Sequence, residues 1–420
     1  MQQGPTPSHA RPLGIAAATD SGSDRRQRKP NGLDRWVASQ LARRMDPGRV
    51  RVALWDESAV ADENPAAVLW IGDPGALWKL AANPGLQFGD LYSSGRIKVQ
   101  GDLMAVVEQG YRNIGTASRG ERLRRLASRL PAPDLADSRR NIHHHYDLGN
   151  DFYRLWLDRE ALQYTCAYYA DPSMTLEQAQ QAKMHHVCRK LRLRRGDRVV
   201  EAGSGWGGFA LFMAKHYGVQ VRSFNIAREQ VQYARDWVKR ENLGDQVEFV
   251  ADDFRNITGE YDVFVSIGML EHVGPANYAG LGRLMNRVLT REGRGLVHTI
   301  GRDAPRPLNA WINRRIFPGA YPPTLRQMMD LFEPNGLSVL DVENIRLHYA
   351  KTLQDWLDRY EQNVDQVHAM FDENFVRAWR LYLTGSIAGF VHGGLQLFQV
   401  HFARSGVNEI PWTRADIYPR

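Results

Sequence analysis

A glycine-rich turn with an acidic residue in front of it is the part of this sequence that could hold a cofactor. The valines at 199–200 lead into Glu201, and the pattern Gly-x-Gly-x-Gly-Gly follows at 203–208. Glycines let the backbone approach a ligand closely and adopt positive φ. The apolar segment 209–217 then predicts a helix, and the first N–H groups of a helix have no partner inside it. Together these features predict a site for a nucleotide-like cofactor.

The acidic residues indicate which cofactor suits this turn. A site for NAD normally carries Asp or Glu at the end of the second strand, where the side chain binds the ribose. Residues 223–225 read Ser-Phe-Asn there instead, and the turn differs by one residue from the dinucleotide pattern. Glu201 is placed to meet the cationic methionine end of S-adenosylmethionine. A tight strand-to-helix turn without a ligand is the simpler alternative, and the acid in front of the glycines favours the cofactor.

Alternating strands and helices predict the sheet that would position this turn. The expected strands cover 197–202, 219–224, 246–250, 261–266 and 294–300, and helices are expected at 209–217 and 228–240. Such alternation is typical of a parallel, doubly wound α/β sheet. Ligands of these sheets bind at the carboxyl ends of the strands.

A smaller α/β module is expected before this sheet, with strands at 50–55, 67–71 and 97–99 and helices from Pro74 and near Leu103. Residues 1–30 are rich in Pro, Ser, Gly, Asp and Arg and predict a disordered basic tail. Arginines accumulate from 112 to 140, around a proline-containing linker at 131–134. The expected domains are therefore the tail (1–30), a lipid- or membrane-associated module (31–130) and a catalytic domain (131–420).

Charge and cysteine content restrict the partners and the compartment. The formal net charge is +7 and the pI about 9.4, which favours an anionic partner, either nucleic acid or an anionic membrane surface. A basic protein without such a partner fits the charge equally well. The two cysteines, Cys166 and Cys188, lack disulfide or metal spacing, which is typical of a reducing cytoplasm. The three histidines at 143–145 lack an accompanying ligand cluster, so no metal site is expected.

No membrane-spanning segment is expected from the sequence. The N-terminus lacks the apolar region of a signal peptide. The longest uncharged run, 381–400, contains glycines, glutamines and His392, and it predicts a buried helix followed by a strand. Any membrane contact is therefore expected to be peripheral, on the cytoplasmic side.

Seven motifs occur in an order that resembles the cyclopropane-fatty-acyl-phospholipid synthases and the related mycolic acid cyclopropane synthases. They are 145–151 (HYDLGND), 163–168 (QYTCAY), 201–208 (EAGSGWGG), 266–274 (SIGMLEHVG), 317–319 (FPG), 347–350 (LHYA) and 402–404 (FAR). The resemblance covers about 140–420 strongly and 70–130 weakly. It implies a class I S-adenosylmethionine-dependent methyltransferase with a seven-stranded Rossmann-like sheet. The implied reaction transfers a methylene group to the cis double bond of unsaturated phospholipid acyl chains and forms a cyclopropane.

The resemblance also implies which residues surround the cofactor. Tyr164 and Thr165 would close over the methionine portion, and Glu201 would face its charge. The turn itself would consist of Gly203, Ser204, Gly205 and Gly207. Asn225 and Gln230 would lie near the ribose and adenine, and Asp253 and Phe254 would hold the adenine end. A carboxylate at a strand end can accept a hydrogen bond from the adenine amino group, and an aromatic face can stack on the base. Ser204 stands where many members of the family have Cys, a change that should be harmless.

The implied chemistry needs no strong nucleophile from the protein. The alkene attacks the sulfonium methyl, a carbocation forms, and loss of a proton from the new methyl closes the ring. The site must stabilise positive charge, supply a base and exclude water. By resemblance the base is a bound bicarbonate, held by Cys166, Glu271, His298, the backbone of Ile300, and Tyr349. Tyr278 or Tyr321 could stabilise the cation by cation–π attraction.

Each of these residues also has a structural interpretation. Cys166 could be a small buried hydrophobe, His298 a hydrogen-bonded core residue, and Tyr349 a packing residue. Glu271 could cap the helix after the fourth strand. Ser386 stands where several members of the family carry Cys, so covalent catalysis from that position is not expected.

Two other functions are weighed against cyclopropanation. A hydride shift in the same cation would give a methyl-branched or methylene chain. A non-catalytic lipid- or nucleic-acid-binding protein would have no need of the catalytic set, and the chain lacks an aromatic-and-basic nucleic-acid module. A homodimer is implied by the family alone.

Overall fold

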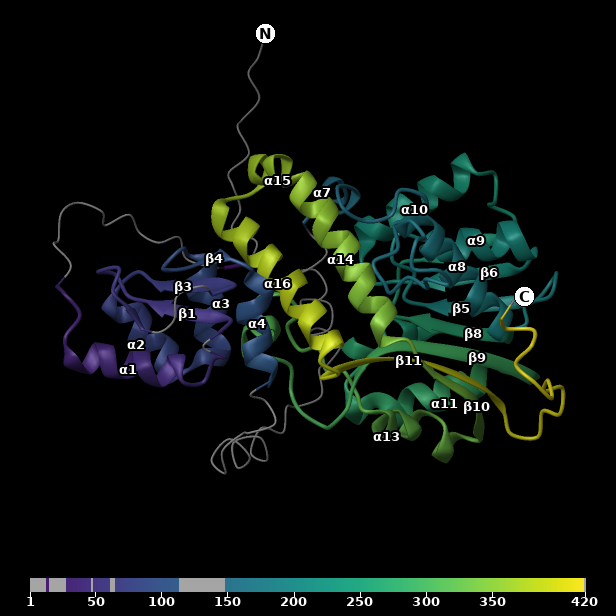
Figure 1. The fold of residues 1–420 in the computed structure, drawn as a ribbon. Coiled ribbons are helices and arrows are strands. Elements are labelled where there is room, and N and C mark those ends of the chain that lie inside the picture. Colours follow the sequence, from purple (N-terminus) through teal and green to yellow (C-terminus); the bar gives the residue numbers. More distant parts are fainter. Residues whose placement is uncertain (1–12, 15–27, 47, 61–64, 113–147, 419–420) are drawn as a thin grey trace, which may run out of the picture. The chain divides into compact units, whose positions relative to one another are not determined.

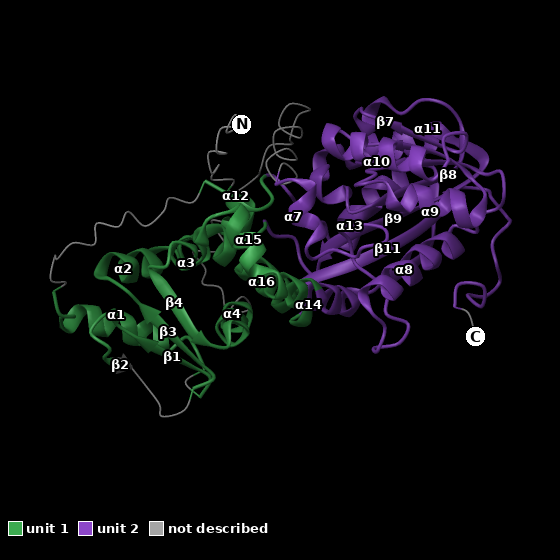
Figure 2. Ribbon diagram, turned by 90° about the horizontal axis from the view of Figure 1, so that it is seen from above, with its two compact units in different colours: residues 1–128, 308–318, 356–392 green, residues 129–307, 319–355, 393–420 purple. Residues whose placement is uncertain are grey.

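The computed structural model describes residues 13–14, 28–46, 48–60, 65–112 and 148–418. The chain divides into two compact units (Figures 1 and 2). Unit 1 comprises 1–128, 308–318 and 356–392, and unit 2 comprises 129–307, 319–355 and 393–420. Most of the predicted tail, most of the arginine-rich stretch, the linker at 131–134 and the histidines at 143–145 lie outside the described residues.

Unit 2 is built on a seven-stranded sheet in the order β10-β11-β9-β8-β5-β6-β7. Its strands are β5 (Arg198–Ala202), β6 (Gln220–Phe224), β7 (Val247–Val250), β8 (Tyr261–Ile267), β9 (Leu289–Arg302), β10 (Leu337–Asn344) and β11 (Leu395–Arg404). The five strands β5 to β9 pair in parallel. The predicted Rossmann-like methyltransferase sheet is therefore confirmed, and so are its seven strands.

The prediction of parallel strands is confirmed for β5 to β9, and β11, for which no direction was predicted, is antiparallel to both β9 and β10. The start of β11 lies beside the end of β10: Asn344, the last residue of β10, pairs with Phe398 near the start of β11. A strand that starts beside the end of its neighbour must run in the opposite direction.

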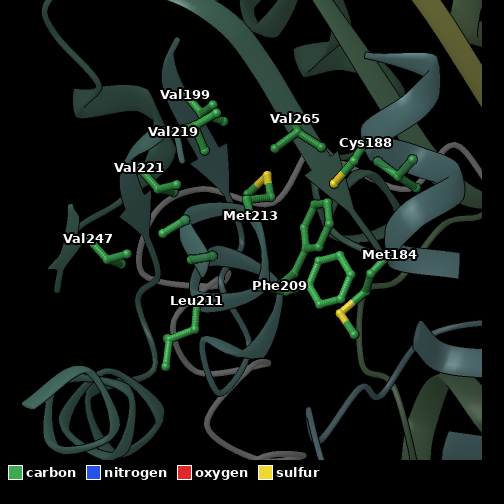
Figure 3. Close-up of a cluster of buried hydrophobic side chains, with 14 of the residues drawn as sticks. Met184, Cys188, Val199, Phe209, Leu211, Met213, Val219, Val221, Val247 and Val265 are labelled. Atoms are coloured by element: carbon green, nitrogen blue, oxygen red, sulfur yellow. The ribbon is translucent and has the colours of Figure 1, made fainter. Parts of the chain in front are cut away.

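Helices cover both faces of this sheet. They are α7 (Asn150–Arg154), α8 (Leu176–Lys190), α9 (Gly208–Tyr217), α10 (Arg228–Arg240), α11 (Tyr278–Val288) and α13 (Leu325–Met328), with short 3₁₀ turns η2 (Phe254–Asn256), η3 (Leu270–His272), η4 (Pro275–Asn277), η5 (Met329–Leu331) and η6 (Glu333–Asn335). Successive strand side chains point to opposite faces, so Val199 and Val200 enter different cores. Figure 3 shows Met184 and Cys188 of α8 converging with Phe209 of α9 on the first of these cores. Cys188 is thus a buried packing residue.

Unit 1 contains a four-stranded sheet in the order β2-β1-β3-β4. Its N-terminal elements are α1 (Gly32–Ala42), β1 (Val50–Ala53), β2 (Ala59–Val60), β3 (Ala67–Ile71), α2 (Pro74–Ala82), α3 (Pro84–Ser93), β4 (Ile97–Gly101) and α4 (Leu103–Arg112). The expected small α/β module is present. Two later helices, α12 (Ala310–Arg315) and α16 (Glu373–Val391), pack on α3, and α16 also packs on α4.

Unit 1 is not one continuous stretch of the sequence, because α12 and α16 group with the N-terminal module. The helix α14 (Arg346–Gln362) begins in unit 2 and ends in unit 1, where α15 (Val364–Met370) follows it. The functional roles given to the three predicted domains stay predictions. No helix among the described residues is long and apolar enough to cross a bilayer. The uncharged run 381–400 forms the end of α16 and the start of β11, as predicted.

Candidate cofactor and catalytic site

The glycine-rich turn connects β5 to α9 and depends on the absence of side chains. Gly203, Gly205 and Gly207 all have positive φ, at 95°, 51° and 91°. A Cβ on Gly207 would lie 2.6 Å from Phe249 Cζ. The N–H groups of Gly203 and Ser204 donate to the carbonyl of Phe224 at 2.9 and 3.3 Å, which ties the turn to β6. The turn is therefore a rigid part of unit 2.

A pocket opens at the carboxyl ends of β5, β6 and β8, next to this turn. Ten of the eleven residues predicted for the cofactor line it: Tyr164, Thr165, Glu201, Gly203, Ser204, Gly205, Asn225, Gln230, Asp253 and Phe254. Gly207 does not line the pocket, because it packs against Phe249 and Ala234 beneath the turn. The structure thus brings together residues that lie up to 90 positions apart in the sequence, and their roles toward a cofactor stay predictions.

Asn225 holds the turn against the start of α10. Its Nδ2 donates to the carbonyl of Gly205 at 3.2 Å and to Gln230 Oε1 at 3.0 Å. Its Oδ1 accepts from the N–H of Ala227 at 3.0 Å. The side chain that stands where an NAD site has an acid is therefore a neutral structural clamp on the pocket wall.

Glu201 is a buried carboxyl at the base of the pocket, with only 2% of its surface exposed. Its Oε2 accepts a hydrogen bond from the hydroxyl of Ser223. Burial raises the pKa of Glu201 to about 7, and the Ser223 hydrogen bond and the nearby charge of Lys183 act against this rise. A cationic ligand end would restore the carboxylate, because an opposite charge favours the ionised form.

A buried lysine that the sequence analysis missed supports the segment 163–165. Lys183 Nζ donates to Thr165 Oγ1 at 3.1 Å and to Gln163 Oε1. The side chain of Gln180 donates to the carbonyl of Thr165 at 2.8 Å. Burial lowers the pKa of Lys183 to about 8. Its neighbours on the largely polar helix α8 gave no sign in the sequence that this lysine is buried.

The expected adenine end of the pocket is formed by the loop after β7. Asp253 is buried and its Oδ1 accepts from the N–H of Arg255 at 2.9 Å. Arg255 also lies over the ring of Phe254, 5.3 Å from its centroid. Asp252, which we did not predict, lines the pocket as well, and its position two residues after a strand was the available signal.

Glu271 lies in η3, directly after pocket residues at the end of β8. Its Oε1 accepts from the backbone N–H of Ile300 on β9 at 2.6 Å. Glu271 therefore does not cap a helix, and the structural alternative for this residue is wrong. The Ile300 N–H, which we had assigned to an anion, is engaged here, so that role stays a prediction that requires the bond to Glu271 to open.

The second oxygen of the Glu271 carboxyl is buried. Glu271 Oε2 has no hydrogen-bond partner among the described residues. Burial raises the pKa of Glu271 to about 7, against the effect of its hydrogen bond from Ile300. An acid with such a pKa can hold or give up a proton near neutral pH.

His298 on β9 is a neutral, buried imidazole. Burial, helped by the positive charges of Lys183 and Lys190, lowers its pKa to about 3. Its Nδ1 lies 3.2 Å from Gln399 Nε2, and its Nε2 has no partner among the described residues. The carbonyl of His298 accepts from the N–H of Gly268, a pocket residue, at 2.9 Å. The backbone of His298 is thus bonded to a residue that lines the pocket.

The motifs around Cys166 and Tyr349 meet through α14. The N–H of Ala167 donates to Thr352 Oγ1 at 3.0 Å, and the N–H of Tyr169 donates to His348 Nδ1 at 2.9 Å. Tyr349 is buried and shares a helical face with Thr352, three residues later. Cys166 is fully buried, and burial raises the pKa of its thiol. A high thiol pKa argues against Cys166 as a nucleophile and leaves it as a weak donor.

Two tyrosines flank Glu271. The N–H of Tyr321 donates to the carbonyl of Glu271 at 2.7 Å. Tyr278 is fully buried, and its pKa is raised by burial and by the charge of Glu271. Its hydroxyl has no partner among the described residues. Ser386 belongs to α16 in unit 1.

The sheet order, the single antiparallel strand β11 and the pocket at the strand ends define the class of S-adenosylmethionine-dependent methyltransferases. The family model described as mycolic acid cyclopropane synthetase matches residues 134–400, and the chain belongs to this family. A probable fatty acid methyltransferase of Pseudomonas putida is 34% identical over 395 residues, 88% of this chain and 96% of that protein. The cyclopropane-fatty-acyl-phospholipid synthase of Escherichia coli K12 is 38% identical over 265 residues, 63% of this chain and 68% of that protein.

Solved structures agree with this assignment. The cyclopropane synthase MmaA2 from Mycobacterium tuberculosis matches with a TM-score of 0.61 and 27% identity, covering 64% of this chain and all of that one. Mycolic acid cyclopropane synthase CmaA1, solved with SAH and CTAB, matches with a TM-score of 0.60 and 29% identity over 63% of this chain and 98% of that one. The protein is therefore an S-adenosylmethionine-dependent methyltransferase that acts on lipid acyl chains.

Proposed function

We propose that this enzyme transfers a methylene group from S-adenosylmethionine to the cis double bond of unsaturated phospholipid acyl chains and forms a cyclopropane ring. The observation that carries the proposal is that Glu271 and His298 are both buried on segments next to the cofactor pocket, Glu271 just after the pocket residues of β8 and His298 bonded through its carbonyl to Gly268. Both side chains present a polar atom without a partner among the described residues. Buried polar atoms are rarely left unpaired, and a bound polar group would supply partners for these two atoms.

The reaction requires a site that tolerates a carbocation. His298 is neutral, because burial lowers its pKa to about 3, and it adds no positive charge beside the cation. Glu271, with a pKa of about 7, contributes negative charge when ionised. The buried ring of Tyr278 offers a π face for the cation. Burial of all three side chains keeps water from capturing the carbocation.

Bicarbonate fits the unpaired atoms of this site. Its oxygens can accept from a ring N–H of His298, and its hydroxyl can donate to Glu271 Oε2. Cys166 and Tyr349 would complete the set, and Ile300 would join it once Glu271 releases its N–H. When bound, bicarbonate would supply the general base that removes a proton from the transferred methyl.

A second product is supported by the names of two relatives. The Pseudomonas putida relative is called a probable fatty acid methyltransferase, and a relative from Mycobacterium tuberculosis, 34% identical over 283 residues, is called a tuberculostearic acid methyltransferase. The alternative function is therefore C-methylation of unsaturated chains to methyl-branched or methylene products. The same cation leads to both outcomes, and a hydride shift before proton loss separates them.

We further propose that unit 1 makes peripheral contact with an anionic membrane surface. On α1, Leu33 and Trp36 are more than half exposed, and on α2 Trp78 is 42% exposed. Exposed tryptophans beside basic residues are typical of surfaces that lie in a membrane interface. Arg43 follows on the same chain segment and brings positive charge. A cytoplasmic location and a homodimer stay predictions.

The test is an assay with purified enzyme, S-adenosylmethionine and vesicles of cis-unsaturated phospholipid, followed by mass spectrometry of the acyl chains. We expect a gain of one CH₂ per modified chain. Addition and removal of bicarbonate at constant pH then tests the base, and we expect turnover to fall when bicarbonate is removed. An unchanged acyl-chain mass in all conditions overturns the proposed function.

A further inference from the structure

Gln399 lies beside His298, on the neighbouring strand of the sheet. It is fully buried on β11, opposite His298 on β9 and opposite Glu343 on β10. Its Nε2 is 3.2 Å from His298 Nδ1. Gln399 does not line the cofactor pocket. Its contact with the site therefore runs through the imidazole ring.

This contact indicates which ring nitrogen carries the proton. An amide N–H₂ is a donor, so the His298 Nδ1 that faces it must be an acceptor. A neutral imidazole carries one proton, which then resides on Nε2. Nε2 is the ring atom without a partner among the described residues. The free end of the ring is thereby a hydrogen-bond donor.

We propose that Gln399 is a positioning residue that holds His298 in the Nε2–H tautomer, so that His298 donates a hydrogen bond to an anion in the catalytic site. The proposal rests on the proposed function in one respect, the presence of an anion. The opposite amide orientation would place Gln399 Oε1 against Nδ1–H and leave Nε2 as an acceptor. In that orientation Nε2 could not donate a hydrogen bond to the anion.

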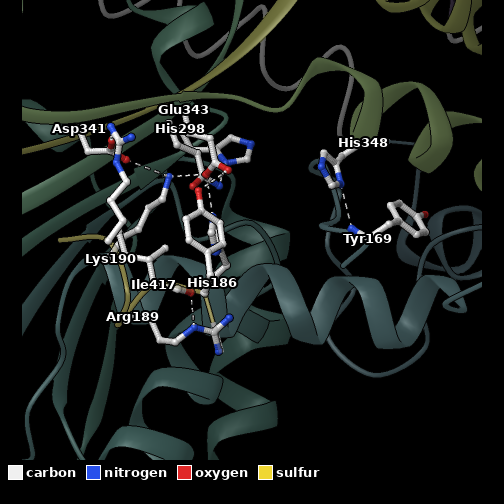
Figure 4. Close-up of polar contacts among 12 residues, drawn as sticks. Tyr169, His186, Arg189, Lys190, His298, Asp341, Glu343, His348 and Ile417 are labelled. Carbon is white, nitrogen blue, oxygen red and sulfur yellow. Dashed lines mark hydrogen bonds and ion pairs between the residues drawn. The ribbon is translucent and has the colours of Figure 1, made fainter. Parts of the chain in front are cut away.

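The surroundings leave the amide of Gln399 available for His298. Glu343, its other neighbour in the sheet, already accepts from Lys190 Nζ at 2.6 Å and lies 2.7 Å from His186 Nε2. Figure 4 shows Glu343, Lys190 and His186 grouped beside His298. The ring of Tyr168 stacks on His186 with centroids 4.2 Å apart. These contacts hold the side chains of Glu343 and His186 in place, so Glu343 does not compete with His298 for the amide of Gln399.

The experiment compares three variants by activity and by ¹⁵N NMR of histidine-labelled enzyme, with the His298 signals assigned from a His298→Gln sample. In the wild type we expect a pyrrole-like Nε2 and a pyridine-like Nδ1. Gln399→Glu keeps the shape, but its carboxylate accepts from Nδ1 and should reverse the tautomer. Gln399→Met removes the hydrogen bond and should give a mixture. His401→Gln, buried on the same face of β11, is the control for damage to the strand and should keep the wild-type tautomer.

The expected activities follow the tautomer. Gln399→Glu should lose about 100-fold or more in kcat, while its affinity for S-adenosylmethionine stays within about twofold of the wild type. A wild-type Nδ1–H tautomer, or a Gln399→Glu enzyme with nearly full kcat, overturns the proposal. These results are separate from the proposed function, since the tautomer is read without turnover. A change of product or of base would leave the NMR result standing.

Discussion

Glu271 Oε1 accepts a 2.6 Å hydrogen bond from the backbone N–H of Ile300, which joins the loop after β8 to the neighbouring strand β9. The second carboxyl oxygen, Oε2, is buried and has no hydrogen-bond partner among the described residues. The backbone N–H of Ile300 thus sets the orientation of the Glu271 carboxyl, and burial raises its pKa.

Glu271→Gln tests the chemistry of this carboxyl. The amide oxygen can still accept from Ile300, but the side chain can no longer ionise. We expect kcat to fall by about 100-fold or more, with cofactor affinity retained. Steady-state kinetics and calorimetric titration with S-adenosylmethionine measure the two quantities. Glu333→Gln, at an exposed position in η6, is the matched control; loss of cofactor binding in Glu271→Gln alone would contradict the assigned role.

Glu201 should make cofactor binding depend on pH. Its pKa is about 7 in the free enzyme, so below this pH the carboxyl is mostly protonated. A cationic ligand favours the carboxylate, and binding must then release a proton. Affinity should therefore rise by about tenfold between about pH 5.5 and pH 7.

Calorimetry in buffers of different ionisation enthalpy measures this proton release directly. Glu201→Gln cannot ionise, so its affinity should be weaker and nearly independent of pH over the same range. Equal slopes for wild type and variant would show that another group titrates, and would remove Glu201 from the cationic end of the cofactor.

Lys183 should stabilise both the fold and the segment over the pocket. Lys183→Met leaves Gln163 Oε1 and Thr165 Oγ1 without their buried donor. We expect the free energy of unfolding to fall by about 2–4 kcal/mol and cofactor affinity to weaken. Urea unfolding with and without cofactor measures both effects. Lys215→Met, at a largely exposed lysine on α9, should change neither, and an equal loss in both variants would argue against a specific role.

The exposed side chains of α1 should contribute to membrane binding. The double change Leu33→Ser and Trp36→Ser removes apolar surface from unit 1 without touching its core. Binding to anionic phospholipid vesicles should weaken by about tenfold in a sedimentation assay. Trp412→Ser, at a fully exposed tryptophan in unit 2, is the control. If only the control variant loses binding, the membrane surface lies elsewhere.

Local patterns predicted much of this structure. The segment around Glu201 combines a β-branched strand, glycines with positive φ and an apolar helix, and these signals depend on neighbouring residues only. Long-range pairing was harder to predict. The reversed direction of β11 and the packing of α12 and α16 on α3 follow from how the chain returns, which no local pattern records.

The candidate site likewise combines residues that local motifs predicted with residues that only the completed fold reveals. Motifs predicted Glu271 and His298 as candidate site residues, but they gave no indication of the buried residues Lys183 and Gln399. Lysine on a polar helix normally faces solvent, and a glutamine in a β-strand resembles a surface residue. Only their burial and their partners distinguish them, and both depend on the completed fold.

The central claim is methylene transfer with ring closure, and labelled product tests it most directly. Enzyme, vesicles of cis-unsaturated phospholipid and S-adenosylmethionine with a CD₃ methyl group are incubated, and the acyl chains are analysed by mass spectrometry and NMR. The account predicts a gain of CD₂, because one deuteron leaves as the ring closes, together with the upfield proton signals of a cyclopropane. A gain of CD₂ with olefinic signals, a methyl-branched chain, or no gain in mass would contradict it.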